Sequence, residues 1–151
     1  MVRKVDFNTV LVPIDFSEHS RVALEQAFAL VEGESPVIIL LHVLDPAFAE
    51  FAELHGLAQR DDIMQRMRQE AQNLLQEYVA ARPDDVEIDT IISEGPPFLE
   101  ILQKADDFAV DAIVMGKVGR RGKFEKLLFG STAEKVIRGS DKPVLVLASG
   151  D

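Results

Sequence analysis

The sequence contains no cysteine, which excludes disulfide bonds, thiolate catalysis and cysteine-based metal sites. Histidine is scarce as well, and no two of His19, His42 and His55 have the spacing of metal ligands. No dedicated zinc site is therefore expected. Ser17 and Ser20 have no identifiable base partner, so the sequence gives little support to a hydrolase triad.

Long hydrophobic runs are also missing. No apolar stretch approaches the ~20 residues that a membrane-spanning helix needs. The first ten residues lack the apolar core of a secretory signal. The 151 residues can bury a full core, and we expect one domain over residues 1–151. A cytoplasmic location fits these features.

Basic side chains are scarce before residue 116. Residues 1–115 hold 8 basic and 22 acidic side chains, whereas residues 116–151 hold 8 basic and 4 acidic ones. An acidic body argues against nucleic-acid binding, which neutralises many phosphates. The basic side chains that remain include a local cluster, which either binds one small anionic ligand or is a solvated loop: Lys117, Arg120, Arg121, Lys123 and Lys126.

Apolar runs that are rich in β-branched residues predict five strands, at residues 9–14, 37–43, 86–92, 111–115 and 144–147. Amphipathic periodicity predicts helices at residues 17–31, 61–81, from 97 onward and 131 to about 138. Residues 45–57 permit either a short helix or a partly ordered flap. Strands that alternate with helices favour an α/β fold with a five-stranded, parallel, doubly wound sheet.

Several residues carry local predictions. Ser17 is expected to cap the first helix, and Ser131 with Glu134 matches a capping box at the last one. His42 lies inside an apolar strand and is expected to be a hydrogen-bonded core histidine, whereas His19 and His55 are expected at the surface. The polar start of residues 86–92 indicates a strand near the edge of the sheet.

The stretch 116–132, GKVGRRGKFEKLLFGST, follows a predicted strand and leads into a helix. Glycines let backbone N–H groups approach an anion, and a helix start presents unpaired N–H groups. The pattern therefore has the parts of a phosphate cradle, although it matches neither the P-loop nor the dinucleotide fingerprint. The alternative is a surface loop whose glycines only make turns.

Asp15, at the end of the first strand, has two interpretations. It is either a turn or helix-entry residue, or a carboxylate that serves ribose hydroxyls or a phosphate-bound metal. Ligands of open parallel sheets bind at the carboxyl ends of strands. The spacing leaves open whether the ends of the first and fourth strands lie side by side.

The chain resembles the universal stress protein family along nearly its whole length. The resemblance rests on residues 12–17 (VPIDFS), 41–43 (LHV), 94–97 (EGPP), 113–116 (IVMG), 130–131 (GS) and 142–147 (KPVLVL). Its most specific part is the glycine motif G-x2-G-x9-G-[ST] of the nucleotide-binding members. Here ten residues separate Gly119 from Gly130, one more than in that motif. The extra residue either lies at the loop tip or shifts Gly119 away from the phosphates.

The resemblance implies a three-layer, Rossmann-like sandwich of the adenine nucleotide alpha hydrolase type. It also implies a homodimer through residues 144–147 and bound ATP, with Mg²⁺ or Mn²⁺ held through the phosphates. Asp15 would take the ribose, Pro13 and Ile14 would flank the nucleotide, and the backbone of Val43 would meet the adenine. The remaining implied contacts are with the ribose and α-phosphate, from Met115 and Gly116, and with the phosphates, from Gly119, Gly130, Ser131 and Thr132.

Three functions are compatible with these residues. In order of preference they are an ATP-binding stress-response regulator whose nucleotide state is read by a partner protein, a slow ATPase or phosphotransferase, and a dimeric interaction module that binds no nucleotide. Phosphoryl transfer needs a positioned base. Glu125 is the only acid between Gly116 and Gly130, so no catalytic residue is assigned.

Overall fold

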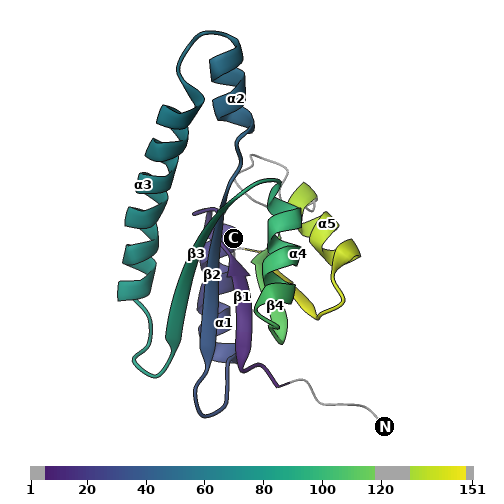
Figure 1. The fold of residues 1–151 in the computed structure, drawn as a ribbon. Helices are drawn as coiled ribbons and strands as arrows, with labels where there is room; N and C mark the ends of the chain where they lie inside the picture. The colour runs from purple at the N-terminus through teal and green to yellow at the C-terminus, as the bar shows by residue number, and fades with distance from the viewer. Residues whose placement is uncertain (1–5, 118–129, 149–151) are drawn as a thin grey trace.

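A computed structural model describes residues 6–117 and 130–148 of the chain. Its centre is a parallel sheet of five strands in the order β3-β2-β1-β4-β5 (Figure 1). The strands are β1 (Thr9–Pro13), β2 (Val37–Leu44), β3 (Glu87–Glu94), β4 (Ala112–Gly116) and β5 (Val144–Leu147). This confirms the predicted five-stranded, doubly wound sheet, and it places β3 at an edge as expected.

Helices cover both faces of the sheet, which gives three layers. They are α1 (Glu18–Leu30), α2 (Ala47–Leu54), α3 (Arg60–Ala80), α4 (Pro97–Asp107) and α5 (Ser131–Gly139). Ala23 of α1 and Leu75 of α3 share a buried cluster with Val12, whereas Ile101 of α4 and Ala133 of α5 are buried in a second cluster on the opposite face. Side chains of one strand alternate between these clusters, as the period of a β-strand requires.

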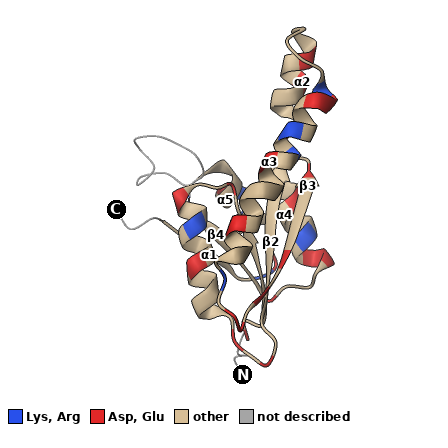
Figure 2. Cartoon of the chain, turned by 90° about the vertical axis from the view of Figure 1, so that its left-hand side faces the viewer, with Lys and Arg blue, Asp and Glu red and all other residues tan. Residues whose placement is uncertain are grey.

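Charged side chains lie mainly on the helices and at the rim of the sheet (Figure 2). The three central strands β1, β2 and β4 carry no Asp, Glu, Lys or Arg, because both of their faces are buried. Within the described part of the chain, every helix is too short or too polar to cross a lipid bilayer.

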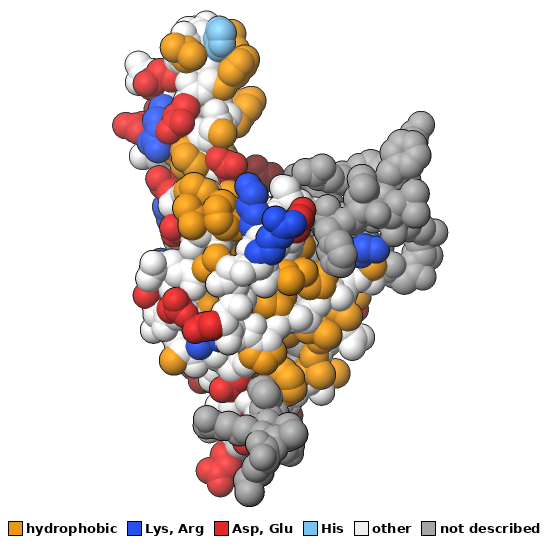
Figure 3. Space-filling view, turned by 90° about the vertical axis from the view of Figure 1, so that its right-hand side faces the viewer, with side chains coloured by type: hydrophobic (Ala, Val, Ile, Leu, Met, Phe, Trp, Pro, Cys, Tyr) orange, Lys and Arg blue, Asp and Glu red, His pale blue; other side chains and the backbone are white. Residues whose placement is uncertain are grey.

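Residues 45–57, which the sequence left open, contain the short helix α2. It projects with the start of α3 beyond the carboxyl end of the sheet (Figures 1 and 3). A small cluster of Leu44, Ala49, Met64 and Ala71 holds it there. The connection from β2 to β3 therefore contains two helices, where the sequence clearly indicated one.

The two predicted helix caps have different outcomes. Ser17 caps α1 as expected, because its hydroxyl accepts a hydrogen bond from the Ser20 N–H at 3.2 Å. The prediction of a capping box at Ser131 is wrong. Gly130 is the N-cap and makes no side-chain cap bond, and Ser131 is the first helical residue. Glu134 instead pairs with Arg138 at 2.7 Å.

Candidate functional site

The sheet opens between β1 and β4 at its carboxyl end. The two strands pair at Val10 with Ala112 and at Leu11 with Ile113, but β1 continues to Pro13 and β4 to Gly116. The chain order reverses here, since it runs outward from β1 through β2 to β3 and then returns to β4 on the other side of β1. Such a switch point is where open α/β sheets bind ligands.

A cavity of about 220 Å³ lies at this point. Nine of the ten site residues predicted from the sequence line it: Pro13, Ile14, Asp15, Val43, Met115, Gly116, Gly130, Ser131 and Thr132. Gly119 lies outside the described residues. The fold thus brings together segments that are about a hundred positions apart in the sequence.

Lys117, the first residue of the predicted basic cluster, also lines the cavity, and the rest of that cluster lies outside the described residues. The cavity has further walls that sequence reasoning did not assign, from Ser20, Leu41, His42, Pro97, Ile101 and Ala133. Ala133 could have been found from helix geometry, because the third residue of a helix also has an unpaired N–H. Pro97 and Ile101 could not, since only the packing of α4 on the sheet brings them to the crevice.

The backbone of Val43 faces the space beyond the end of β1. The Leu41 carbonyl accepts a hydrogen bond from the Ile14 N–H at 2.8 Å, so the backbone of Leu41 points toward β1. Backbone groups two residues apart in a strand point the same way. The N–H and C=O of Val43 therefore point to where β1 has already ended, and they can serve the polar edge of a planar ring.

Asp15 uses one carboxylate oxygen to shape the turn into α1. Its Oδ1 accepts a hydrogen bond from the Ser17 N–H at 3.0 Å, and within the described residues its Oδ2 accepts none. The turn depends on Phe16, which has a φ of +65° that non-glycine residues rarely adopt. The Phe16 ring lies between His42 and Tyr78, at centroid distances of 4.6 and 6.0 Å, which holds this conformation. The Oδ1 contact agrees with the role of Asp15 as a turn residue, and Oδ2 leaves its role as a ligand-binding carboxylate open.

His42 is hydrogen-bonded as predicted, but it is only partly buried and lines the cavity, so its assignment to the core is wrong. Its Nδ1 lies 2.6 Å from the Ile14 carbonyl oxygen. A carbonyl can only accept, so Nδ1 carries the proton in this contact. The bond ties the end of β1 to β2 at the cavity wall. Burial raises the pKa of the hydroxyl of Tyr78, whose ring stacks on Phe16.

The prediction that His19 is exposed is wrong, because the start of α1 packs closely on the end of β4. His19 is buried. A Cβ added to Gly116 would lie 2.8 Å from the His19 carbonyl carbon and 2.9 Å from the Ser20 nitrogen. Real Cβ atoms do not approach backbone so closely, and glycine at position 116 lets α1 and β4 meet at the cavity.

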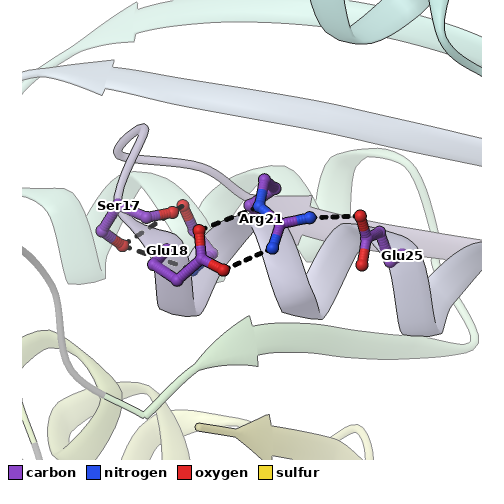
Figure 4. Close-up of polar contacts among 5 residues, drawn as sticks. Ser17, Glu18, Arg21 and Glu25 are labelled. Carbon is purple, nitrogen blue, oxygen red and sulfur yellow. Dashed lines mark hydrogen bonds and ion pairs between the residues drawn. The ribbon is translucent and has the colours of Figure 1, made fainter. Parts of the chain in front are cut away.

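Charged side chains brace the exposed side of the first turns of α1 (Figure 4). Arg21 donates from Nε to Glu18 Oε2 at 2.9 Å and also pairs with Glu25. The hydrogen bond from Arg21 lowers the pKa of Glu18, and the same contact raises the pKa of Arg21. These groups are exposed, so the pairs support the helix locally and contribute little to overall stability.

The start of α5 presents three backbone donors to the cavity. The Gly130 N–H is already bound to the Lys117 carbonyl at 2.9 Å, and the first helical bond runs from the Glu134 N–H to the Gly130 carbonyl at 3.0 Å. The N–H groups of Ser131, Thr132 and Ala133 therefore have no partner within the helix. They carry the positive end of the helix dipole, which favours an anion.

The bond between Gly130 and Lys117 also bears on the longer glycine motif. It joins the two ends of the undescribed segment 118–129 through the backbone, and the Lys117 N–H is bound to the Leu147 carbonyl at 2.6 Å. The position of the α5 N-terminus is thus set by β4 and β5. These bonds fix the Gly130 end of the glycine motif, whereas Gly119 lies outside the described residues.

The described residues contain no group of three or more His, Asp or Glu side chains that could hold a metal ion by themselves. The cavity combines an apolar wall of Leu41, Ile101 and Met115 with the Asp15 carboxylate and the α5 donors. An apolar wall suits a planar base, a carboxylate suits hydroxyl groups, and helix N–H groups suit phosphate. The residues present therefore fit a nucleotide.

In a comparison with known protein families, residues 6–148 match the model described as the universal stress protein family. Universal stress protein MJ0577 of Methanocaldococcus jannaschii is 32% identical, over 95% of this chain and 96% of that protein. The solved structure of MJ0577 superposes with a TM-score of 0.85 and covers 97% of this chain and 99% of that chain.

Two more distant structures contain nucleotides. A universal stress protein in complex with cAMP is 24% identical, with a TM-score of 0.57, and covers 96% of this chain and 99% of that chain. The universal stress protein from Archaeoglobus fulgidus in complex with dAMP is 22% identical, with a TM-score of 0.58, and covers 95% of this chain and 99% of that chain. At these identities the likeness shows the shared fold.

Proposed function

Because the chain belongs to the universal stress protein family, we propose that it binds ATP in the crevice between β1 and β4. The observation that carries the proposal is the cavity itself, which collects nine of the residues implied by the family resemblance at the switch point of the sheet. The cAMP and dAMP complexes of distant relatives support an adenine nucleotide as the ligand. Residues 1–151 would act as a single universal stress protein domain.

The nucleoside would lie across the carboxyl ends of β1, β2 and β4. In this proposal the adenine edge bonds to the Val43 backbone, whose N–H and C=O point past β1. Pro13 and Ile14 flank the base, and Asp15 Oδ2 accepts hydrogen bonds from the ribose hydroxyls. Met115 and Gly116 line the ribose and the α-phosphate.

The phosphates would meet the N-terminus of α5. The backbone N–H groups of Ser131 and Thr132 are the donors, and we add the N–H of Ala133, since the N–H of Gly130 is already bound to Lys117. Gly130 then contributes by starting the helix, and Gly119 is assigned a phosphate contact by resemblance alone. Mg²⁺ or Mn²⁺ would be held through the phosphate oxygens.

A regulatory role would require that the nucleotide state be read by another molecule. We propose a cytoplasmic homodimer joined through β5 and an unidentified regulatory protein as the reader. β5 is an edge strand of the sheet, and its apolar residues Val144–Leu147 are only partly covered. An exposed apolar edge strand is a ready template for pairing with a second copy.

Calorimetric titration of the purified chain with ATP in the presence of Mg²⁺ tests the proposal. We expect saturable binding of one ATP per chain, and weaker binding of GTP, whose base presents a different hydrogen-bonding edge to Val43. A flat titration at millimolar ATP would contradict it. In that case the dimeric module without a nucleotide would be the better interpretation.

A further inference from the structure

Helix α2 presents its large side chains to solvent and its small ones to the protein. Ala49 and Ala52 are buried, whereas Phe48, Phe51 and Leu54 of α2, and Leu57 just after it, are exposed by 66%, 55%, 81% and 72%. An ordinary surface helix has the opposite arrangement. We call these four exposed side chains the α2 ridge. Figure 3 shows hydrophobic side chains gathered at the projecting end of the molecule.

The ridge belongs to a well-anchored element. Ala49 and Leu44 pack with Met64 of α3 in a buried cluster. The chain that follows α2 is fixed by hydrogen bonds from the Leu57 N–H to the Ala52 carbonyl and from the Arg60 N–H to Glu53 Oε2, both at 2.8 Å. The exposure of the ridge is therefore built into the fold, and contiguous exposed apolar surface commonly marks an interaction site.

The surroundings of the ridge are acidic. Helical spacing places Glu50 and Glu53 along the flank of α2 next to Leu54. Apart from His55, residues 45–62 carry a single basic side chain, Arg60, which lies within 4.0 Å of carboxylates of Glu50, Asp61 and Glu94. The same segment contains five acidic side chains, at Asp45, Glu50, Glu53, Asp61 and Asp62. Figure 2 shows acidic positions at this end of the molecule.

We propose that the α2 ridge is a docking site for an amphipathic helix of a partner protein, with an apolar face bordered by Lys or Arg. The apolar face would cover the ridge, and the cationic border would meet Glu50 and Glu53. A second copy of the ridge or an anionic membrane surface carries the same sign of charge, so both are disfavoured. The ridge residues do not line the cavity, and this proposal is independent of ATP binding.

Fluorescence anisotropy with a labelled synthetic peptide tests the proposal. The probe is an 18-residue Leu/Lys peptide with leucines at i, i+3, i+4 and i+7 spacing, and the control is a scrambled peptide of the same composition. We expect the Leu/Lys helix to bind and the scrambled peptide to bind at least about tenfold more weakly. Phe51→Ser with Leu54→Ser should weaken binding by a similar factor.

Two further variants make the test specific. Leu99→Ser with Phe108→Ser removes two apolar side chains outside the ridge, which are exposed by 49% and 44%, and it should leave binding unchanged. Glu50→Lys should weaken binding of the Leu/Lys peptide and strengthen binding of a Leu/Glu peptide of the same pattern. Circular dichroism melts verify that each variant is folded.

The proposal is overturned if the scrambled peptide binds equally well, or if the ridge variant and the Leu99/Phe108 control behave alike. It is also overturned if the ridge variant instead abolishes self-association in sedimentation or binding to phosphatidylserine vesicles while peptide binding is absent. Those results would assign the ridge to a second copy or to a lipid surface.

Discussion

Asp15 uses only one of its carboxylate oxygens within the described structure. Oδ1 holds the turn into α1 through the Ser17 N–H, and we propose that Oδ2 accepts hydrogen bonds from a ligand. The sequence presented a turn role and a ligand role as alternatives, because a pattern of residues does not show that Phe16 adopts a φ of +65° or that Asp15 lines a cavity. A change at Asp15 should therefore affect both the turn and the ligand.

Asp15→Ala should weaken ATP binding by about 10- to 100-fold, as expected for the loss of a charged hydrogen-bond acceptor. The variant should bind ATP and 2′,3′-dideoxy-ATP with nearly equal affinity, whereas the unaltered chain should prefer ATP. Calorimetric titration measures all four affinities.

Asp111→Asn is the matched control for this carboxylate. Asp111 Oδ2 accepts hydrogen bonds from the Asn8 and Thr9 N–H groups at 3.0 and 2.8 Å and does not line the cavity. The control should lower the melting temperature and leave the preference for ATP intact. A ribose preference that survives Asp15→Ala would remove Asp15 from the site.

Gly116→Ala should destabilise the fold by about 1–3 kcal/mol, because the new methyl group would meet the α1 backbone at His19. Gly139→Ala is the comparison. There the added Cβ would lie 2.7 Å from Leu102 Cδ1, the end of a side chain that can rotate away. Urea unfolding should show a clear loss for Gly116→Ala and a smaller one for Gly139→Ala. Equal losses would mean that the contact between α1 and β4 is not tight.

At the scale of elements, the strands were the most predictable part of the fold. Residues 144–147 were predicted with the observed boundaries, because a short β-branched run between turns has few alternatives. Helix α2 was not, since its outward phenylalanines and inward alanines invert the usual pattern. The N-cap of α5 was misplaced by one residue, at Ser131 instead of Gly130, because the backbone bond between Gly130 and Lys117 leaves no local signal.

The N-terminus of α5 offers a test of backbone donors. Ser131→Pro removes the N–H of the first helical residue, and proline is well tolerated there. The preceding Gly130 has a ψ of 149°, which suits a residue before proline. We expect ATP binding to weaken by about tenfold or more, with little change for adenosine.

Ser131→Ala separates the backbone N–H from the side chain. It keeps the N–H and removes the hydroxyl, so it should retain most of the affinity for ATP. If Ser131→Ala and Ser131→Pro weaken binding equally, the hydroxyl is the donor and the role given to the helix N-terminus is incorrect. Calorimetry with ATP and adenosine distinguishes these results.

At the scale of the whole molecule, the order of the strands decides where the site lies. Spacing along the sequence did not establish that β1 and β4 are neighbours, because the same alternation of strands and helices is compatible with more than one strand order. Once they are neighbours, residues from positions 13–15, 43, 115–116 and 130–132 meet in one cavity. The burial of His19 was not predictable from the sequence either, because it packs against Gly116, which is distant in sequence.

The proposed dimer is also a property of the whole molecule. Leu145→Lys introduces a charge on β5, where Leu145 is 39% exposed. In a dimer joined through β5 the two lysines would lie close together, so the variant should sediment as a monomer. Leu54→Lys on α2 is a control of the same chemistry and should remain dimeric. A dimer that withstands Leu145→Lys would place the interface elsewhere.

The central claim is that the crevice between β1 and β4 holds an adenine nucleotide. Mass spectrometry of the chain, purified without added nucleotide and with or without Mg²⁺, tests it most directly. We expect ATP or its hydrolysis product to be released on denaturation, with higher occupancy when Mg²⁺ is present. The claim is contradicted if no adenine nucleotide is found under either condition and none binds when ATP is added at millimolar concentration.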